Sequence, residues 1–118
     1  MISLDITVTE KAQEYIAKAS EIITKNNGKP ALAIWTERIR SWGGSRIEIN
    51  IDLYSEKEIL NADGFENKGN INEINIPLYI QKTAYPYLSE KLVIGYSGFM
   101  FKKLYLTDYT PVRFQGRC

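Results

Sequence analysis

The 118-residue sequence contains no histidine, and its single cysteine, Cys118, is the last residue. Without histidine the chain lacks the most common general base at neutral pH and the most common transition-metal ligand. Nucleophilic catalysis of the Ser-His-Asp or Cys-His type is therefore excluded. One cysteine also excludes a disulfide within the chain. Cys118 stays a candidate redox or metal-binding thiol, although a terminal residue is usually accessible but poorly preorganised.

The chain also has little net charge and no long apolar run. Its formal net charge of +1 creates no long-range field toward nucleic acid, an acidic substrate or an anionic membrane. No apolar run approaches the roughly 18 to 20 residues that span a bilayer. The start, "MISLDITVTEKA", has an early acidic residue and no apolar core, so it predicts no signal peptide. We therefore expect a cytoplasmic protein with no membrane partner.

What is present predicts one domain over residues 1–118, of ordinary globular composition. Residues 2–8 alternate like a strand. Thr9 then suits a helix N-cap, with Glu10 in the first turn, where a negative charge favours the helix dipole. We expect Gly28 to end this helix in a left-handed conformation. The helix is amphipathic, with an apolar stripe at spacings of three, four and seven: Ala12, Tyr15, Ile16, Ala19, Ile22 and Ile23.

The rest of the chain is rich in strand patterns. "ALAIWTERI" and the alternating "SRIEINIDLY" predict two antiparallel strands joined by a longish loop. Residues 55–70 are polar and predict a surface connection or an irregular hairpin. In the next strand, "INEINIPLYI", Pro77 cannot donate a ladder hydrogen bond, so we expect an edge strand or one that starts there. A short helical or turn segment, "KTAYPYLSEKL", precedes two closing strands, in which Phe99, Phe101, Leu104 and Leu106 are expected in the core or an interface. The fold class is mainly β, an α+β domain with one N-terminal amphipathic helix.

The stretch "RIRSWGGS" is the candidate binding loop: Arg38, Arg40, Ser41, Trp42, Gly43, Gly44 and Ser45. Its glycines could let the backbone approach a ligand and hold an anion. The alternative is a hairpin connection that needs positive φ angles. Trp42 and the nearby arginines could stack on bases and contact phosphates. The near-neutral charge instead favours Trp35 in the core and a solvated hairpin whose arginines stack on Trp42. If the hairpin is exposed, Trp42 becomes a candidate anchor for a protein partner.

The order of elements resembles a known family. The resemblance is carried by "DITVTEKAQEYIAK" followed by "PALAIWTERIRSWGGSRIEINI", and then by "INIPLYIQKTAYPYLSEKLVIGYSGFMFKKLYLTD". These stretches are similar to the HesB-like proteins, the A-type iron–sulfur carriers. The closing "GFMFKKLYLTDY" resembles the CC/Se-motif branch of that family. The resemblance covers nearly the whole chain and implies a HesB-like β-rich domain, but it consists of apolar positions and glycines.

The chain departs from this family at the residues that would bind metal. Ser41 and Trp42 stand where the family's loop has its cysteines, and a single cysteine in "GRC" stands where A-type carriers have Cys-x-Cys. Cluster and zinc sites usually need several converging thiolates or imidazoles. We therefore expect no metal and no cofactor.

Three functions stay open. The first is a non-enzymatic HesB-like module that binds a protein partner or a small ligand at "RSWGG". The second is a residual iron–sulfur carrier that uses Cys118 in an oligomer, and the third, less favoured, is nucleic-acid binding by the Arg/Trp hairpin. An enzyme is not expected, because no nucleophile, base and orienting partner can be assembled. The Pro77 strand and the alternating strand over 45–54 are compatible with a homodimer.

Overall fold

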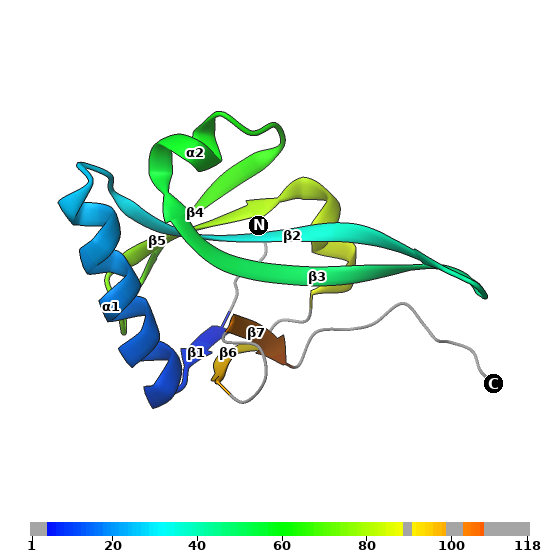
Figure 1. Ribbon diagram of the computed structural model, residues 1–118, viewed down its shortest axis with the longest axis horizontal. Helices are drawn as coiled ribbons and strands as arrows, with labels where there is room; N and C mark the ends of the chain where they lie inside the picture. Colours follow the sequence, from blue (N-terminus) through cyan, green and yellow to red (C-terminus); the bar gives the residue numbers. More distant parts are fainter. Residues whose placement is uncertain (1–4, 89–90, 99–102, 108–118) are drawn as a thin grey trace.

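The computed structural model describes residues 5–88, 91–98 and 103–107 (Figure 1). It is an α+β fold with one long N-terminal helix and two mixed sheets, which confirms the predicted class. The elements are β1 (Asp5–Val8), α1 (Glu10–Lys25), β2 (Pro30–Ser41), β3 (Gly44–Ser55), α2 (Glu56–Leu60), β4 (Phe65–Ile71), β5 (Ile76–Gln81), the 3-10 helix η1 (Lys82–Tyr87), β6 (Lys91–Ser97) and β7 (Lys103–Thr107). Within these ranges no helix is long and apolar enough to cross a membrane.

Helix α1 begins as predicted. The side chain of Thr9 accepts a hydrogen bond from the backbone N–H of Ala12 at 3.3 Å, and Glu10 lies in the first turn. The apolar stripe packs on the core except at Ile22, whose side chain is 62% exposed. The prediction for Ile22 was wrong because it is rotated by about 100° around the helix from Ile23, which does reach the core.

The end of α1 differs from the prediction at Gly28. Asn27, with φ 65°, takes the left-handed conformation one residue earlier, and asparagine tolerates it better than most residues. Gly28 is needed for space instead. A Cβ atom there would lie 2.9 Å from Ile23 Cγ2 and 3.1 Å from Ser55 Cβ. The glycine therefore lets the end of α1 pass close to the end of β3.

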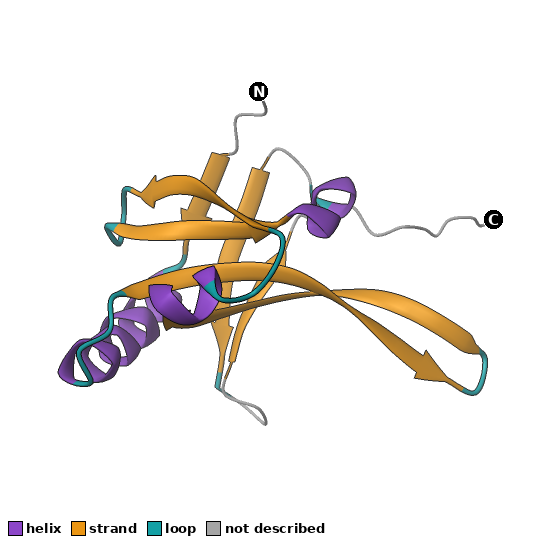
Figure 2. Ribbon diagram, turned by 90° about the horizontal axis from the view of Figure 1, so that it is seen from above, coloured by secondary structure: helices purple, strands orange, loops and turns teal. Residues whose placement is uncertain are grey.

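The larger sheet has the strand order β3-β2-β5-β4. Strands β2 and β3 pair antiparallel along their whole length, from Pro30 opposite Ser55 to Ser41 opposite Gly44. Strand β5 pairs in parallel with β2 only at residues 32–34. The remainder of β2 and β3 therefore extends beyond the sheet as a two-stranded projection, which is clear in Figure 2.

Strand β5 lies inside this sheet, so the edge alternative predicted for Pro77 was wrong, whereas the other alternative, a strand that starts at the proline, holds to within one residue. The strand starts at Ile76, and pairing with β2 begins only at Leu78. Pro77 is opposite Asn70 of β4 and precedes the part of β5 that has β2 on its other side. The missing N–H of proline therefore interrupts no bond to β2, which reconciles an interior strand with a proline.

The smaller sheet has the order β1-β6-β7, with β1 parallel and β7 antiparallel to β6. Together with α1 it covers one face of the larger sheet, and the main core fills the space between them (Figure 1). Leu104 and Leu106 of β7 are in this core, as predicted, whereas Phe99 and Phe101 lie outside the described residues.

The segment 55–70 is more ordered than its polar sequence indicates. Ser55 and Glu58 form a reciprocal capping box that starts α2, and β4 follows after a turn. The signal Ser-x-x-Glu was present in the sequence. The segment lies at the surface as predicted, apart from the buried Ile59, and its second half pairs with β5 as an irregular antiparallel hairpin. The short helix α2 was not predicted.

Candidate functional site

The predicted binding loop is the end of a hairpin rather than a loop. Arg38, Arg40 and Ser41 belong to β2, and Gly44 and Ser45 belong to β3, which leaves Trp42 and Gly43 as a two-residue turn. The positive φ, 128°, falls on Gly44. We call the projecting residues 36–49 the arm. Because β2 and β3 stay paired up to Ser41 and Gly44, the connection is shorter than the longish loop that the sequence predicted.

The arginines of the arm do not converge on one surface. Residues directly opposite one another in an antiparallel pair share a face, and successive residues alternate. Arg38 and Arg40 lie on the face that continues the core side of β2, whereas Arg46 lies opposite Ile39 on the other face. Arg46 is paired there with Glu48 at 2.9 Å. No arginine–Trp42 stacking is recorded among the described residues. Because the arginines of the arm are distributed over its two faces, they do not form one basic surface, which argues against the nucleic-acid hypothesis.

Trp42 is fully exposed at the tip of the arm, at 106% of its reference area. A Cβ atom added at Gly43 or Gly44 would meet no atom of the described chain within 4 Å apart from its chain neighbours, so the space around both glycines is open. A large exposed aromatic ring at the end of a projection is a feature of contact surfaces.

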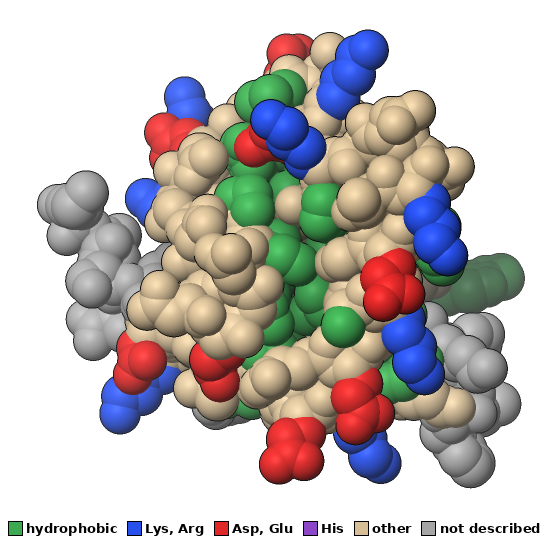
Figure 3. Space-filling view, turned by 90° about the vertical axis from the view of Figure 1, so that its left-hand side faces the viewer, with side chains coloured by type: hydrophobic (Ala, Val, Ile, Leu, Met, Phe, Trp, Pro, Cys, Tyr) green, Lys and Arg blue, Asp and Glu red, His purple; other side chains and the backbone are tan. Residues whose placement is uncertain are grey.

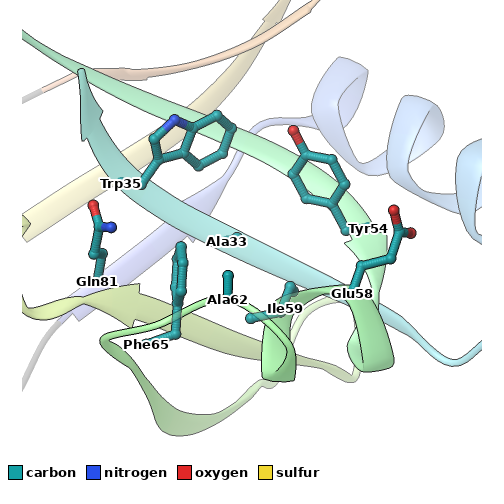
Figure 4. Close-up of a pocket in the computed structure, with 8 residues that line it drawn as sticks. All are labelled: Ala33, Trp35, Tyr54, Glu58, Ile59, Ala62, Phe65 and Gln81. Atoms are coloured by element: carbon teal, nitrogen blue, oxygen red, sulfur yellow. The ribbon is translucent and has the colours of Figure 1, made fainter. Parts of the chain in front are cut away.

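A cavity lies on the face of the larger sheet that is turned away from the main core (Figure 4). Its volume is about 310 Å³. We call it the aromatic pocket, because three rings from three strands stand around it: Trp35 on β2, Tyr54 on β3 and Phe65 on β4. The other lining residues are Ala33, Glu58, Ile59, Ala62 and Gln81.

The sequence of β2 explains the hollow. Ala33 and Trp35 are two residues apart and share this face, so a small residue lies beside a large one. Ala33 forms the floor and packs with Ile59 and Tyr79 in a second buried cluster. The rings of Trp35 and Tyr54 stand above it with centroids 5.8 Å apart and planes at 57°. Large side chains around an alanine floor leave space that the chain does not fill.

Helix α2 closes one side of the pocket and is held there by several polar contacts. Its first residue donates its N–H to the carbonyl of Lys29 at 2.7 Å. The buried Tyr79 donates its hydroxyl to Glu56 Oε2 at 2.7 Å and accepts from Asn67 at 3.3 Å. Burial, followed by the bond to Glu56, raises the pKa of Tyr79. The wall of the pocket that carries Glu58 and Ile59 is therefore fixed to the sheet.

The surroundings of the pocket are acidic. Glu58 is the one charged residue among the described residues that line it. Its Oε1 accepts from the backbone N–H and the hydroxyl of Ser55. Burial, followed by the negative charges of Asp52, Glu58 and Glu37, raises the pKa of the Tyr54 hydroxyl. These carboxylates act together on one ring of the pocket.

A second hollow lies beside α1, at the end of the molecule shown in Figure 3, where apolar side chains are visible between polar surroundings. It measures about 380 Å³ and is lined by Gln13, Ile16, Ala17, Ser20, Pro30, Glu73, Ile74 and Ile76. Ser20 Oγ is buried there without a hydrogen-bond partner in the described structure. Glu73 and Gln13 are both used structurally, since they bond the backbone N–H and carbonyl of Val8 at 3.0 and 2.9 Å.

The described residues hold no group of three or more His, Cys, Asp or Glu side chains that could bind a metal. Cys118 lies outside the described residues. The pocket residues were missed in the sequence because Trp35 was interpreted as core and Tyr54 only as part of an alternating strand. The signal that was available is the Ala-x-Ala-x-Trp spacing of residues 31–35.

Comparisons give no further assignment: no family model matches the chain, and neither a curated protein nor a solved structure matches it. The HesB-like resemblance therefore stays a prediction, and the function has to be argued from the site itself.

Proposed function

We propose that this chain is a non-enzymatic HesB-like module, without the family's metal-binding cysteines, that binds a small ligand in the aromatic pocket. The observation that carries the proposal is a cavity of about 310 Å³ with three aromatic walls on an alanine floor. Its volume is at the lower end of the range of small-molecule sites. The site differs from the "RSWGG" turn predicted from the sequence.

The lining suits a compact ligand with an apolar part and one or two polar groups. Trp35, Tyr54 and Phe65 offer ring faces and edges for stacking. Glu58 and Gln81 are the side chains that could orient the ligand through hydrogen bonds. Because the rings come from different strands and α2 is fixed to the sheet, the pocket is largely preformed. A preformed site reduces the entropic cost of binding.

The test is a binding screen on the full chain. Trp35 and Trp42 are the only tryptophans, so Trp42→Phe leaves Trp35 as the single tryptophan reporter inside the pocket. We expect small aromatic and alkylammonium compounds to change its fluorescence in a saturable way. Ala62→Leu should abolish the change, because Ala62 is an exposed lining residue whose enlargement fills the cavity.

The matched control is Ala17→Leu, the same enlargement at an exposed residue of the hollow beside α1. It should leave binding unchanged. A screen without any saturable ligand, or ligands that bind equally well to Ala62→Leu, would overturn the proposal.

A second candidate is self-association through the arm, favoured by the fully exposed Trp42 at its tip. Past Ile34, β2 has no pairing with β5, and β3 is an edge strand, so both sides of the arm have unpaired backbone groups in the described structure. Such edges can pair with a second copy. Sedimentation equilibrium should then show a wild-type dimer that Trp42→Ser weakens, whereas a wild-type monomer up to high micromolar concentration would contradict this candidate.

A further inference from the structure

We propose that the aromatic pocket takes the alkylated ammonium group of a small organic cation, a tertiary or quaternary amine. This inference rests on the proposed function, since it names the ligand class of the same site. It combines two observations: the three ring walls around one cavity and the carboxylates on the same side of the sheet.

The rings are the first part of the argument. An aromatic ring has a negative face, which attracts a cation placed over it, and tryptophan does so most strongly. Figure 4 shows Trp35, Tyr54 and Phe65 on different sides of the cavity, with Ala33 behind it. A methylated ammonium group that contacts Ala33 would have ring atoms on several sides. Its methyl groups would replace water against apolar atoms while its charge faces the rings.

The carboxylates are the second part. Glu58 lines the pocket at its rim: it is an exposed residue whose carboxylate lies beside Tyr54 at the outer edge of the cavity (Figure 4). Its Oε1 is held by the capping box, and Oε2 has no hydrogen-bond partner among the described residues. Asp52 lies directly opposite Ala33, on the face of the sheet that carries the pocket. Glu37 shares this face and accepts a hydrogen bond from Asn50, the residue opposite Trp35.

Among the residues that the structure describes, no basic side chain lines the cavity to balance these charges. Arg46, the basic residue of the arm on this face, is paired with Glu48. An anion placed between the rings would lose hydration and face Glu58 without compensation. A bare metal ion fits no better, because the lining does not offer enough oxygen atoms to replace its hydration shell. An alkylated ammonium is weakly hydrated and apolar at its surface, so it satisfies both features of the site.

The test compares two probes of the same shape. Choline and 3,3-dimethyl-1-butanol differ in a quaternary nitrogen against a quaternary carbon, so only choline is charged. Each is titrated into the Trp42→Phe protein, with Trp35 fluorescence and backbone amide NMR shifts as readouts. We expect choline to bind about ten-fold more tightly than its neutral isostere. The difference in affinity should shrink as the salt concentration is raised, because salt screens the attraction between the ligand cation and carboxylates that are exposed to solvent.

Glu58→Gln separates charge from structure. Glutamine also serves as the third residue of a capping box, so α2 should keep its start. We expect this variant to weaken choline several-fold and to leave the neutral isostere unchanged. The matched control is Glu21→Gln, the same charge change at an exposed residue of α1, and it should alter neither affinity.

The outcomes distinguish this inference from the proposed function. Equal affinity for choline and its isostere, or a Glu58→Gln effect no larger than that of Glu21→Gln, overturns the cation assignment while ligand binding in the pocket stands. Failure of every compound in the screen overturns both. A trimethyl-lysine peptide that binds more tightly than free trimethyl-lysine would assign the cation to a protein side chain and overturn the assignment to a free small molecule.

Discussion

The hydroxyl of Tyr79, on the buried side of β5 that faces α2, donates a hydrogen bond to Glu56 Oε2 at 2.7 Å. Tyr79 is 4% exposed, and Glu56 is the first residue of α2. This bond joins the short helix to the sheet across 23 residues of sequence. A five-residue helix has little stability of its own, so its position depends on such contacts.

Tyr79→Phe should therefore lower the free energy of unfolding by about 1–2 kcal/mol, since it removes a bond to a half-buried carboxylate. Urea unfolding followed by circular dichroism measures the change. Tyr87→Phe is the control, because the Tyr87 hydroxyl has no hydrogen bond among the described residues. Equal stabilities for the two variants would show that the Tyr79–Glu56 bond contributes nothing.

Tyr85 gives the chain a defined sensitivity to alkaline pH. Burial, followed by its 2.7 Å hydrogen bond to Glu66 and the charge of that carboxylate, raises the pKa of Tyr85 to about 12. In the unfolded chain the pKa returns to 10.0. The folded state therefore holds the phenol proton more tightly, and this contribution is complete below pH 10 and is lost as the pH rises toward 12.

Tyr85→Phe should accordingly show a shallower loss of stability than the wild type between about pH 10 and 12. The direct measurement is the absorbance of phenolate at 295 nm, as the difference between wild type and variant. This difference is the phenolate absorbance of Tyr85 alone. If it titrates at the ordinary tyrosine pKa instead of near 12, the prediction is wrong.

Gly28→Ala should destabilise the fold through a steric clash. The added Cβ would lie 2.9 Å from Ile23 Cγ2 and 3.1 Å from Ser55 Cβ, closer than carbon atoms normally approach. Over-packing of this kind costs about 1–3 kcal/mol. Thermal unfolding should show a lowered Tm. Gly43→Ala serves as the control, since nothing lies within 4 Å of that Cβ, and its Tm should stay close to wild type.

The two tryptophans should differ in their contribution to stability. Trp42→Ala at the exposed tip should change the free energy of unfolding by less than about 0.5 kcal/mol. Trp35→Ala removes a half-buried ring that packs on Tyr54 and the second cluster, and it should cost about 1–3 kcal/mol. Chemical denaturation of both variants checks this. A loss of stability in Trp42→Ala as large as that in Trp35→Ala would mean that the arm packs on another surface.

Metal content tests the carrier alternative. Each chain has one thiol and no histidine, and two chains would supply only two thiolates. Because clusters usually need more such ligands, protein purified without oxygen should contain no stoichiometric iron or acid-labile sulfide. Cys118→Ala should have the same composition. Stoichiometric iron and sulfide in the wild type that disappear in the variant would instead support a shared site at Cys118.

Local patterns in the sequence were sufficient for α1 and for the β2–β3 hairpin. Thr9 begins α1 because its side chain satisfies a free backbone N–H within the same turn. The alternation of Ile49, Ile51 and Leu53 places one face of β3 toward the core because strand side chains alternate. These outcomes depend on residues close together in the chain, so periodicity and capping predict them.

Only the tertiary structure decided the features that combine distant segments. Pro77 was expected either at an edge or at the start of its strand. The structure places it near the start of an interior strand, whose pairing with β2 begins at Leu78. The less favoured nucleic-acid alternative needed the arginines on either side of Trp42 to act together, yet the register places Arg46 on the face opposite Arg38 and Arg40. Register and strand order are long-range properties, and a shift of one residue exchanges the faces.

The aromatic pocket also combines a local feature of the sequence with contributions from distant segments. The sequence by itself determined that Ala33 and Trp35 share one face of a strand, because that follows from their spacing. The tertiary structure brought Tyr54 and Phe65 from neighbouring strands and Glu58 from α2 around that alanine. No local propensity specifies a hollow, since its existence depends on the packing of side chains from segments that only the folded sheet brings together.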